Sequence, residues 1–352
     1  MSDLLFKMNE KTDAGALPPG TPMDIRLGLT KAEDVAFPLR WGILGAGEIS
    51  RQWVHTVQGY ASATVSAVAA RSKERASEFA ARHGIDSVYS DYASMVKSSE
   101  VDIIYVGTIP AFHKEHALLA IEAGKHVLCE KPFSANGTDA REMYAAAEKN
   151  KVMVQHGLWT RFFPAMEHAR LAIESGMIGE VMMVQADFDP IYTIQAAVMA
   201  FGTDLMPRSI TATNRHGILE YDDDRSAVLS FPPFMSEFPE VTEIIGTKGR
   251  ITLEQPAHSP TTITVRVPGK VPSRYMDANT PAPAQRFEYP IPESVKIPDG
   301  YPNQEGFIYQ AEAVHRCLAA GLTECPQFDS EESLYVIDLL AEFQRLREKI
   351  KD

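Results

Sequence analysis

The chain has 352 residues, of which 45% are hydrophobic and 23% charged, as in folded globular proteins. This length favours two domains over one. The formal net charge of −13 argues against nucleic acid or an anionic membrane as a partner, because both bind basic surfaces.

The three cysteines, Cys129, Cys317 and Cys325, stand in no CxxC motif, and no His/Cys cluster has metal-ligand spacing. We therefore expect a reduced, cytoplasmic protein without a metal site. No apolar run approaches the roughly 20 residues of a membrane helix. Residues 1–37 are polar and proline-containing, lack the pattern of a signal peptide, and are interpreted as an N-terminal extension without chemistry.

Between residues 38 and 157, short apolar runs alternate with helical stretches, and Gly84 and Gly124 stand where helices should end. The expected strands are 41–44, 64–70, 101–107, 126–129 and 151–155, and the expected helices are 75–84, 113–125 and 138–150. Such alternation predicts βαβ units and hence an N-terminal Rossmann-like domain with a parallel sheet.

Between residues 158 and 352, the candidate strands are longer and alternate polar with apolar residues. They cover 180–188, 209–214, 226–231, 241–246, 249–254 and 261–267. The proline-rich segment 255–303 is predicted to be largely a long surface loop, and two helices near 304–320 and 330–350 close the chain. The fold class is therefore α/β, with a C-terminal domain built on an open, mainly antiparallel sheet.

A glycine turn follows the first strand, in LRWGILGAGEISRQW (39–53). Gly45, Ala46 and Gly47 stand between strand and helix, and Ser50 replaces the third glycine of the GxGxxG fingerprint. A turn without side chains lets the backbone approach a pyrophosphate, whose charge the helix N-terminus stabilises. A tight turn with no ligand is the alternative, which the place in the first βαβ unit disfavours.

The tip of the second strand carries Arg71, Ser72 and Arg75 rather than a carboxylate. NAD sites use an Asp or Glu there to hold the ribose hydroxyls, whereas a guanidinium can pair with the 2′-phosphate of NADP. We therefore expect NADP rather than NAD, and a solvated basic helix start is the alternative.

The run HVLCEKPFSA (126–135) places Glu130 and Lys131 at the end of a buried strand. The carboxyl ends of parallel strands form the ligand crevice of an open α/β sheet, so this pair is expected to project towards the cofactor. The alternative is an ion pair in a surface loop.

The stretches GILGAGEIS (42–50), EKP (130–132) and LWTRFFPA (158–165) together resemble the Gfo/Idh/MocA oxidoreductase family. The nearest branch resembles dimeric dihydrodiol dehydrogenase and NADP-dependent D-xylose dehydrogenases. The resemblance implies an NAD(P)-dependent dehydrogenase acting on a CH–OH group of an aldose or a trans-dihydrodiol, and a homodimer.

The resemblance also assigns roles to residues. The implied catalytic residues are Lys131, Tyr192 and Asp189. The implied cofactor-binding residues, joined with those of the glycine turn and the second strand, are Gly45, Ala46, Gly47, Glu48, Ile49, Arg71, Ser72, Arg75, Thr108, His113, Glu130, Lys131, Trp159 and Arg161. Relative to the family, a few dozen residues are absent before Tyr192, Pro110 replaces a histidine, and His156 replaces a glutamate.

The implied chemistry pairs Lys131 with Tyr192. A tyrosine has an ordinary pKa of about 10, and a neighbouring cation favours its phenolate, which can then act as a base. The alternative for Tyr192 is a core tyrosine. Trp159 is expected to face the cleft, and Arg161 is expensive to bury without an anionic or hydroxyl-rich partner. A catalytically impaired cofactor-binding homologue, or an enzyme acting on another sugar, are the competing functions.

The acidic run YDDDRS (221–226) is interpreted as a solvated turn between two strands. Its spacing is not that of a known calcium loop, so no metal is assigned to it.

Overall fold

The computed structural model describes residues 38–268 except 61, 234, 236 and 238, together with 282–291 and 300–351. The N-terminal extension lies outside the described residues. The chain forms two compact units. The first comprises the described residues up to Phe162 together with Ile291–Ile337, and the second comprises Phe163–Pro290 and the chain from Asp338 on.

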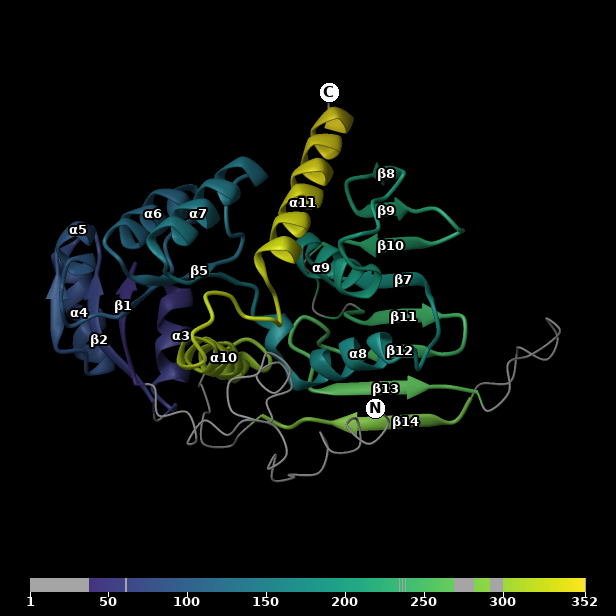
Figure 1. Cartoon of the computed structure of the whole chain (residues 1–352), viewed down its shortest axis with the longest axis horizontal. Helices are drawn as coiled ribbons and strands as arrows, with labels where there is room; N and C mark the ends of the chain where they lie inside the picture. Colours follow the sequence, from purple (N-terminus) through teal and green to yellow (C-terminus); the bar gives the residue numbers. More distant parts are fainter. Residues whose placement is uncertain are drawn as a thin grey trace. The chain divides into compact units, whose positions relative to one another are not determined.

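A parallel six-stranded sheet organises the first unit, with the strand order β3-β2-β1-β4-β5-β6 (Figure 1). This is the order of the doubly wound dinucleotide-binding sheet. The strands are β1 (Leu39–Leu44), β2 (Ala63–Ala69), β3 (Ser87–Tyr89), β4 (Ile103–Val106), β5 (His126–Glu130) and β6 (Val154–Gly157). All five pairings between neighbours are parallel.

Helices connect these strands. They are α3 (Glu48–Val57), α4 (Lys73–His83), α5 (Tyr92–Val96), α6 (His113–Glu122) and α7 (Gly137–Asn150), with 3₁₀ turns η2 (Pro110–Phe112) and η3 (Trp159–Phe162). Local sequence sets their ends. The side chains of Ser72, Asp91 and Asn136 accept backbone N–H groups at the starts of α4, α5 and α7, and Gly84 ends α4 in the left-handed region at φ 64°.

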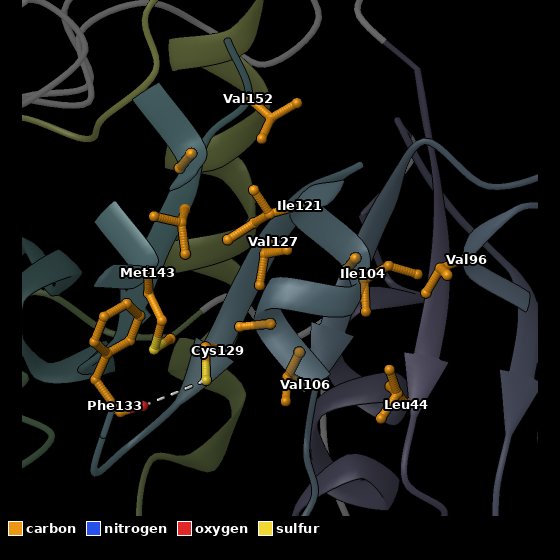
Figure 2. Packing of buried hydrophobic residues seen from close by; sticks show 14 of the residues in the cluster. Leu44, Val96, Ile104, Val106, Ile121, Val127, Cys129, Phe133, Met143 and Val152 are labelled. Atoms are coloured by element: carbon orange, nitrogen blue, oxygen red, sulfur yellow. Dashed lines mark hydrogen bonds between the residues drawn. The ribbon is translucent and has the colours of Figure 1, made fainter. Parts of the chain in front are cut away.

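The core of the first unit lies between its sheet and the helices. Figure 2 shows Val127 and Cys129 of β5 packed near Ile121 of α6 and Met143 of α7. These side chains are completely buried, and burying a large apolar side chain contributes about 1.5–3 kcal/mol. The Cys129 Sγ lies 3.8 Å from the Phe133 carbonyl oxygen, so the chain folds back directly after β5.

Helix α10 (Phe307–Ala319), preceded by the 3₁₀ turn η5 (Gln304–Gly306), also belongs to the first unit. It packs on α3 and η3. The Trp41 indole N–H donates to His315 Nε2 at 3.0 Å. The structure thus groups residues 291–337 with the nucleotide-binding sheet, whereas the sequence-based division assigned everything after 157 to the second domain.

The second unit is built on an eight-stranded mixed sheet, ordered β14-β13-β12-β11-β7-β10-β9-β8 (Figure 1). Its strands are β7 (Val181–Asp187), β8 (Ser209–Ala212), β9 (His216–Glu220), β10 (Ser226–Ser230), β11 (Thr242–Gly246), β12 (Arg250–Leu253), β13 (Thr262–Arg266) and β14 (Ala284–Glu288). Only β7 and β10 pair in parallel. The predicted fold class is therefore confirmed, although strand β14 lies in the proline-rich segment that was predicted as a loop.

Helices α8 (Pro164–Glu174) and α9 (Pro190–Phe201) cover one face of this sheet. The alternating burial of β9 and β10 fits this arrangement, because Leu219 and Leu229 are buried while Ile218 and Val228 are exposed. The later part of α11 (Ser330–Lys351) contributes Phe343, which lies against Gly217. No helix in the described part of the chain is long and apolar enough to cross a membrane.

Candidate active site and cofactor site

Four strands of the first unit end at one edge of the sheet, because all of them run in parallel. Beyond these ends lie Gly45 after β1, Arg71 after β2, Thr108 after β4 and Lys131 after β5. The strand order places β2 and β4 on either side of β1, so the chain changes direction there, which is where open α/β sheets bind nucleotides.

The turn after β1 needs glycine at its first position. Gly45 has φ 105°, a region that other residues rarely adopt, and an added Cβ would lie 2.9 Å from the Thr108 Cγ2 atom and 3.0 Å from the Gly107 carbonyl oxygen. The backbone conformation and the packing alone therefore explain glycine at position 45, whether or not a ligand binds.

Gly47 differs, since the nearest atom to an added Cβ would be the Gly107 oxygen at 3.8 Å. Among the described residues beyond its chain neighbours, no atom lies closer to that position. Gly47 is also the N-cap of α3, and no side chain caps the amides of the first turn. An open position beside uncapped helix amides fits a pyrophosphate, so the residues present fit a dinucleotide cofactor.

Ser50 fills the position of the third glycine without loosening the packing. Its side chain is completely buried and its hydroxyl lies 3.5 Å from the Gly107 carbonyl oxygen. A Cβ added to Gly107 would lie 2.2 Å from Ser50 Oγ. Gly107, the residue directly after β4, thus allows the close approach of helix and strand that the fingerprint glycine normally permits.

The tip of β2 brings its basic residues to the glycine turn. The Arg75 guanidinium donates to the Ala46 carbonyl oxygen at 3.3 Å. Ser72 caps α4 by accepting the Arg75 N–H at 3.2 Å, and its hydroxyl donates to Glu74 at 2.7 Å. Arg71 is exposed beside them.

Glu48 stands at the start of α3, next to Ile49. Hydrogen bonding from Arg51 and from Gln52 lowers the pKa of the Glu48 carboxyl to about 2, so it stays ionised. The Arg51 Nε donates to it at 2.9 Å.

The EKP turn splits its two charged residues between different environments. The Glu130 carboxylate is buried, accepts the Tyr105 hydroxyl at 2.8 Å and accepts the Lys131 backbone N–H at 3.1 Å. Tyr105 in turn stacks on Trp53 at 4.3 Å. Burial raises the pKa of Glu130, while Tyr105 and Lys131 oppose this. Lys131 is the first residue after β5 and is half-buried.

His113 ties the ends of β4 and β5 together. Its Nε2 lies 2.9 Å from the Thr108 carbonyl oxygen and its Nδ1 lies 2.8 Å from the Pro132 carbonyl oxygen. Burial lowers the pKa of His113, and a neutral imidazole donates only one of these two hydrogen bonds. The Thr108 hydroxyl lies 2.9 Å from His116 Nδ1.

Trp159 and Arg161 lie in η3 and are both buried. Trp159 packs against Phe307 with ring centroids 4.6 Å apart. Arg161 is 0% exposed, forms an ion pair with Glu332 of α11, and has its guanidinium 4.8 Å from the centre of the Phe328 ring. The anionic partner that a buried arginine requires is thus a carboxylate of the chain itself, and the role of both residues at the cofactor stays a prediction.

His156, which replaces the family's glutamate, is part of the same buried region. Its Nδ1 lies 2.8 Å from Ser333 Oγ and its ring stacks on Phe133 at 5.1 Å. Burial lowers the pKa of His156 to about 3, so the ring is neutral near pH 7.

Asp189 and Tyr192 belong to the second unit, at the start of α9. Only two residues, Phe188 and Asp189, separate β7 from this helix, which matches the shortening seen in the sequence. The Asp189 carboxylate accepts the Ile191 N–H at 3.1 Å and caps the helix. Tyr192 is buried, with its ring centroid 5.4 Å from that of Phe188. The catalytic roles of both stay predictions.

Sequence reasoning missed the surroundings of Tyr192. The His258 ring lies 5.4 Å from the Tyr192 ring, and Glu240 contacts His258 Nδ1. Neither residue stands in a motif. The one available signal was a histidine in the short proline-containing stretch between the predicted strands 249–254 and 261–267.

The acidic run at 221–226 forms the turn of the β9–β10 hairpin. Asp223 and Asp224 both have φ 58°, and the Tyr221 N–H donates to the Arg225 carbonyl oxygen at 2.9 Å. Within the described ranges, no group of three or more His, Cys, Asp or Glu residues is arranged to hold a metal ion.

Similarity to known proteins agrees with this geometry. Residues 39–158 match the model of the Gfo/Idh/MocA oxidoreductase family with an NAD-binding Rossmann fold. The chain is 31% identical over 340 residues to trans-1,2-dihydrobenzene-1,2-diol dehydrogenase of Bos taurus, covering 87% of this chain and 96% of that protein. It is 32% identical over 337 residues to the Xenopus laevis enzyme of the same name, covering 86% and 96%.

Solved structures share the fold. A 3-ketoreductase from Actinomadura kijaniata in complex with NADP superposes with a TM-score of 0.68 at 22% identity, covering 88% of this chain and 98% of that one. Levoglucosan dehydrogenase in complex with NADH gives a TM-score of 0.71 at 18% identity, covering 89% and 97%. With its NAD(P)-binding domain, this chain belongs to the Gfo/Idh/MocA family of NAD(P)-dependent oxidoreductases.

Proposed function

We propose that this protein is an NADP-dependent dehydrogenase that oxidises a CH–OH group of an aldose such as D-xylose, or of a trans-dihydrodiol. The dihydrodiol dehydrogenases to which it is about 31% identical act on a cyclic diol by name, and levoglucosan dehydrogenase acts on a sugar derivative. The observation that carries the proposal is the EKP turn, where Lys131 directly follows β5 at the nucleotide edge of the sheet and the buried Glu130 carboxylate accepts the Lys131 backbone N–H.

The preference for NADP rests on the tip of β2. Arg71 and Arg75 provide two guanidinium groups, and Arg75 already reaches the glycine turn through the Ala46 carbonyl oxygen at 3.3 Å. Guanidinium groups bind phosphate through paired hydrogen bonds, so this cluster suits the 2′-phosphate. Ser72 adds a hydroxyl at the start of α4.

The proton chemistry is assigned to Lys131 and Tyr192. A bound nicotinamide supplies the hydride acceptor, and the protein must remove one proton from the substrate hydroxyl. The Lys131 ammonium favours the phenolate of Tyr192, which takes this proton. Asp189, as the N-cap of α9, fixes the first turn from which Tyr192 projects.

A homodimer is part of the proposal. The face of the eight-stranded sheet away from α8 and α9 carries the paired apolar side chains Ile218 and Val228, which are 38% and 37% exposed. A second copy would cover them. Light scattering after size exclusion gives the mass, and a mass of one chain at micromolar concentration contradicts the dimer.

A turnover panel tests the function. The purified protein is incubated with NADP⁺ or NAD⁺ and with D-xylose, other aldoses or trans-dihydrodiols, and the reduced cofactor is followed by absorbance. We expect turnover with at least one of these substrates, and a higher kcat/KM with NADP⁺ than with NAD⁺. In R71A and R75A variants this ratio should fall by about 10-fold or more, the cost of one lost charged hydrogen bond.

The short β7–α9 connection favours one competing function, a homologue that binds the cofactor without catalysis. Cofactor binding with no turnover across the whole panel would support that alternative and contradict the dehydrogenase.

A further inference from the structure

Three strand ends of the second unit meet beside Tyr192. In the sheet, β11 lies between β7 and β12, with Thr242 paired to Ala186 on one side and to Leu253 on the other. The Asp187 N–H donates to the Val241 carbonyl oxygen, and the Ala257 N–H donates to the Glu240 carbonyl oxygen. The segment before β11 and the segment after β12 therefore lie at the sheet end from which α9 starts.

Glu240 and His258 form a buried pair at this end. Glu240 is 5% exposed and His258 is 8% exposed. The Glu240 carboxylate contacts His258 Nδ1 and also accepts the His258 backbone N–H at 3.0 Å. One carboxylate thus holds both the backbone and the ring of His258.

The imidazole ring is packed between aromatic side chains. It stacks on Phe188 with ring centroids 4.8 Å apart and an interplanar angle of 20°. The Tyr192 ring lies 5.4 Å away at 61°, an edge-to-face contact, and Tyr192 is 8% exposed. Phe188 and Tyr192 therefore fix the ring plane while Glu240 fixes its rotation.

The carboxylate also determines which nitrogen carries the proton. An ionised carboxylate only accepts hydrogen bonds, so His258 must donate from Nδ1. In the neutral ring this leaves Nε2 as an acceptor, and Ser259 Oγ lies 3.4 Å from it.

We propose that His258, oriented by Glu240, is a positioning residue that accepts the proton of Tyr192 and so prepares its phenolate for the substrate. The Oη–H bond of Tyr192 breaks, an Nε2–H bond forms on His258, and the electron pair stays on the phenolate oxygen. The phenolate then takes the proton of the substrate hydroxyl as the hydride leaves for the cofactor. This inference rests on the proposed dehydrogenase function.

A hydrolytic Ser–His–Glu triad is the other chemistry that these residue types suggest. Ser259 is completely buried and follows His258 directly in the chain, so an acyl substrate has no access to its hydroxyl. The arrangement therefore favours proton transfer between His258 and Tyr192 over hydrolysis at Ser259.

The experiment compares H258Q and E240Q with H168Q as the matched control. His168 is a buried histidine of the same unit whose Nδ1 lies 2.7 Å from the Tyr289 hydroxyl and whose ring meets Phe287. E240Q keeps the size of the side chain and removes only its charge, so it serves if H258Q folds poorly. Steady-state kinetics with the best substrate of the panel gives kcat and KM separately.

We expect kcat to fall by about 10²-fold in H258Q and E240Q, at the low end of the range for positioned proton transfer, with KM changed less than about 3-fold. H168Q should keep the wild-type kcat. If the wild type is active and both H258Q and E240Q keep its kcat, the inference about His258 is overturned while the proposed function stands. A wild type that turns over no substrate contradicts the proposed function itself.

A second readout needs neither cofactor nor substrate. Nitrogen-15 NMR of the histidine rings, with the His258 signals assigned by their absence in H258Q, shows which nitrogen is protonated. The inference predicts the proton on Nδ1 in the resting wild type. A neutral ring with its proton on Nε2 overturns the inference even if turnover is normal.

Discussion

The nucleotide edge of the first unit and the Tyr192 corner of the second are assembled in different ways. At the nucleotide edge, candidate residues lie within two positions of a strand end, as Lys131 follows β5 and Arg71 follows β2. At the Tyr192 corner, the neighbours come from positions 240 and 258, far along the chain. The residues of the nucleotide edge can be recognised from short sequence motifs. The residues of the Tyr192 corner come together only when the sheet of the second unit forms.

The comparison also concerns what charged residues do after burial. The buried Glu130 carboxylate accepts hydrogen bonds from the Tyr105 hydroxyl and from the Lys131 backbone N–H. Arg161, to which the family resemblance gives a cofactor role that stays a prediction, is paired with Glu332 inside the first unit. Variants can show which of these charged residues act at the site and which stabilise the fold.

The largest effect is expected at Lys131. K131M removes the ammonium that supports the catalytic base, so kcat should fall by about 10²–10⁴-fold in the turnover assay. K114M is the control, because the Lys114 ammonium donates to Asp139 at 2.7 Å and so joins α6 to α7. A K131M variant with wild-type kcat would show that the EKP turn has no catalytic part.

Arg161 tests the structural side of the comparison. R161M leaves the Glu332 carboxylate buried without its ion-pair partner and should lower the free energy of unfolding by about 3–5 kcal/mol, measured with urea. The double variant R161M/E332L should regain much of this loss. If R161M is as stable as the wild type, the buried pair is not what Arg161 contributes.

The two glycines of the nucleotide turn should respond differently to valine. G45V brings a Cβ within 2.9 Å of Thr108 at φ 105°, so the unfolding temperature should fall. A Cβ at position 47 would come no closer than 3.8 Å to the Gly107 carbonyl oxygen, so the fold of G47V should persist while NADP⁺ affinity falls about 10-fold or more, by loss of the close backbone approach. Equal affinity of G47V and the wild type, measured by calorimetry, would contradict a pyrophosphate at Gly47.

The smallest expected effect is a change in the free energy of unfolding at acidic pH. His156 is buried neutral with a pKa lowered to about 3, so its contribution to stability is complete above about pH 6.5 and is lost as pH falls towards 3. When the pH is lowered from 7 to 5, the free energy of unfolding should fall by about 1–2 kcal/mol less in H156Q than in the wild type. H216Q, at an exposed position of β9, should behave like the wild type. Identical pH dependence of all three proteins would refute the effect.

The sequence predicted the fold class and most strands, because apolar runs and caps are local signals. The run HVLC predicts β5, and Gly84 predicts the end of α4, each from adjacent residues alone. Strand β14 was missed because it is short, mostly polar and exposed, and forms by pairing with β13. Its stability comes from a partner strand that local sequence does not reveal.

The candidate site was likewise predictable only where its residues form a local sequence pattern. The glycine turn, Arg71 and the EKP turn have recognisable spacing, so their place at the strand ends followed from the parallel sheet. The Glu332 partner of Arg161 and the Glu240–His258 pair depend on contacts between residues 18 to 171 positions apart. Such pairings follow from tertiary structure, and no spacing rule identifies them.

The central claim is that the edge formed by Gly47, Arg75 and Lys131 binds a phosphate-bearing nicotinamide dinucleotide. Isothermal titration calorimetry of the purified protein with NADP⁺ and with NAD⁺ tests it most directly. The account predicts saturable binding of NADP⁺ at one site per chain, with a lower Kd than for NAD⁺. Absence of binding by either cofactor, at concentrations up to the millimolar range, would contradict it.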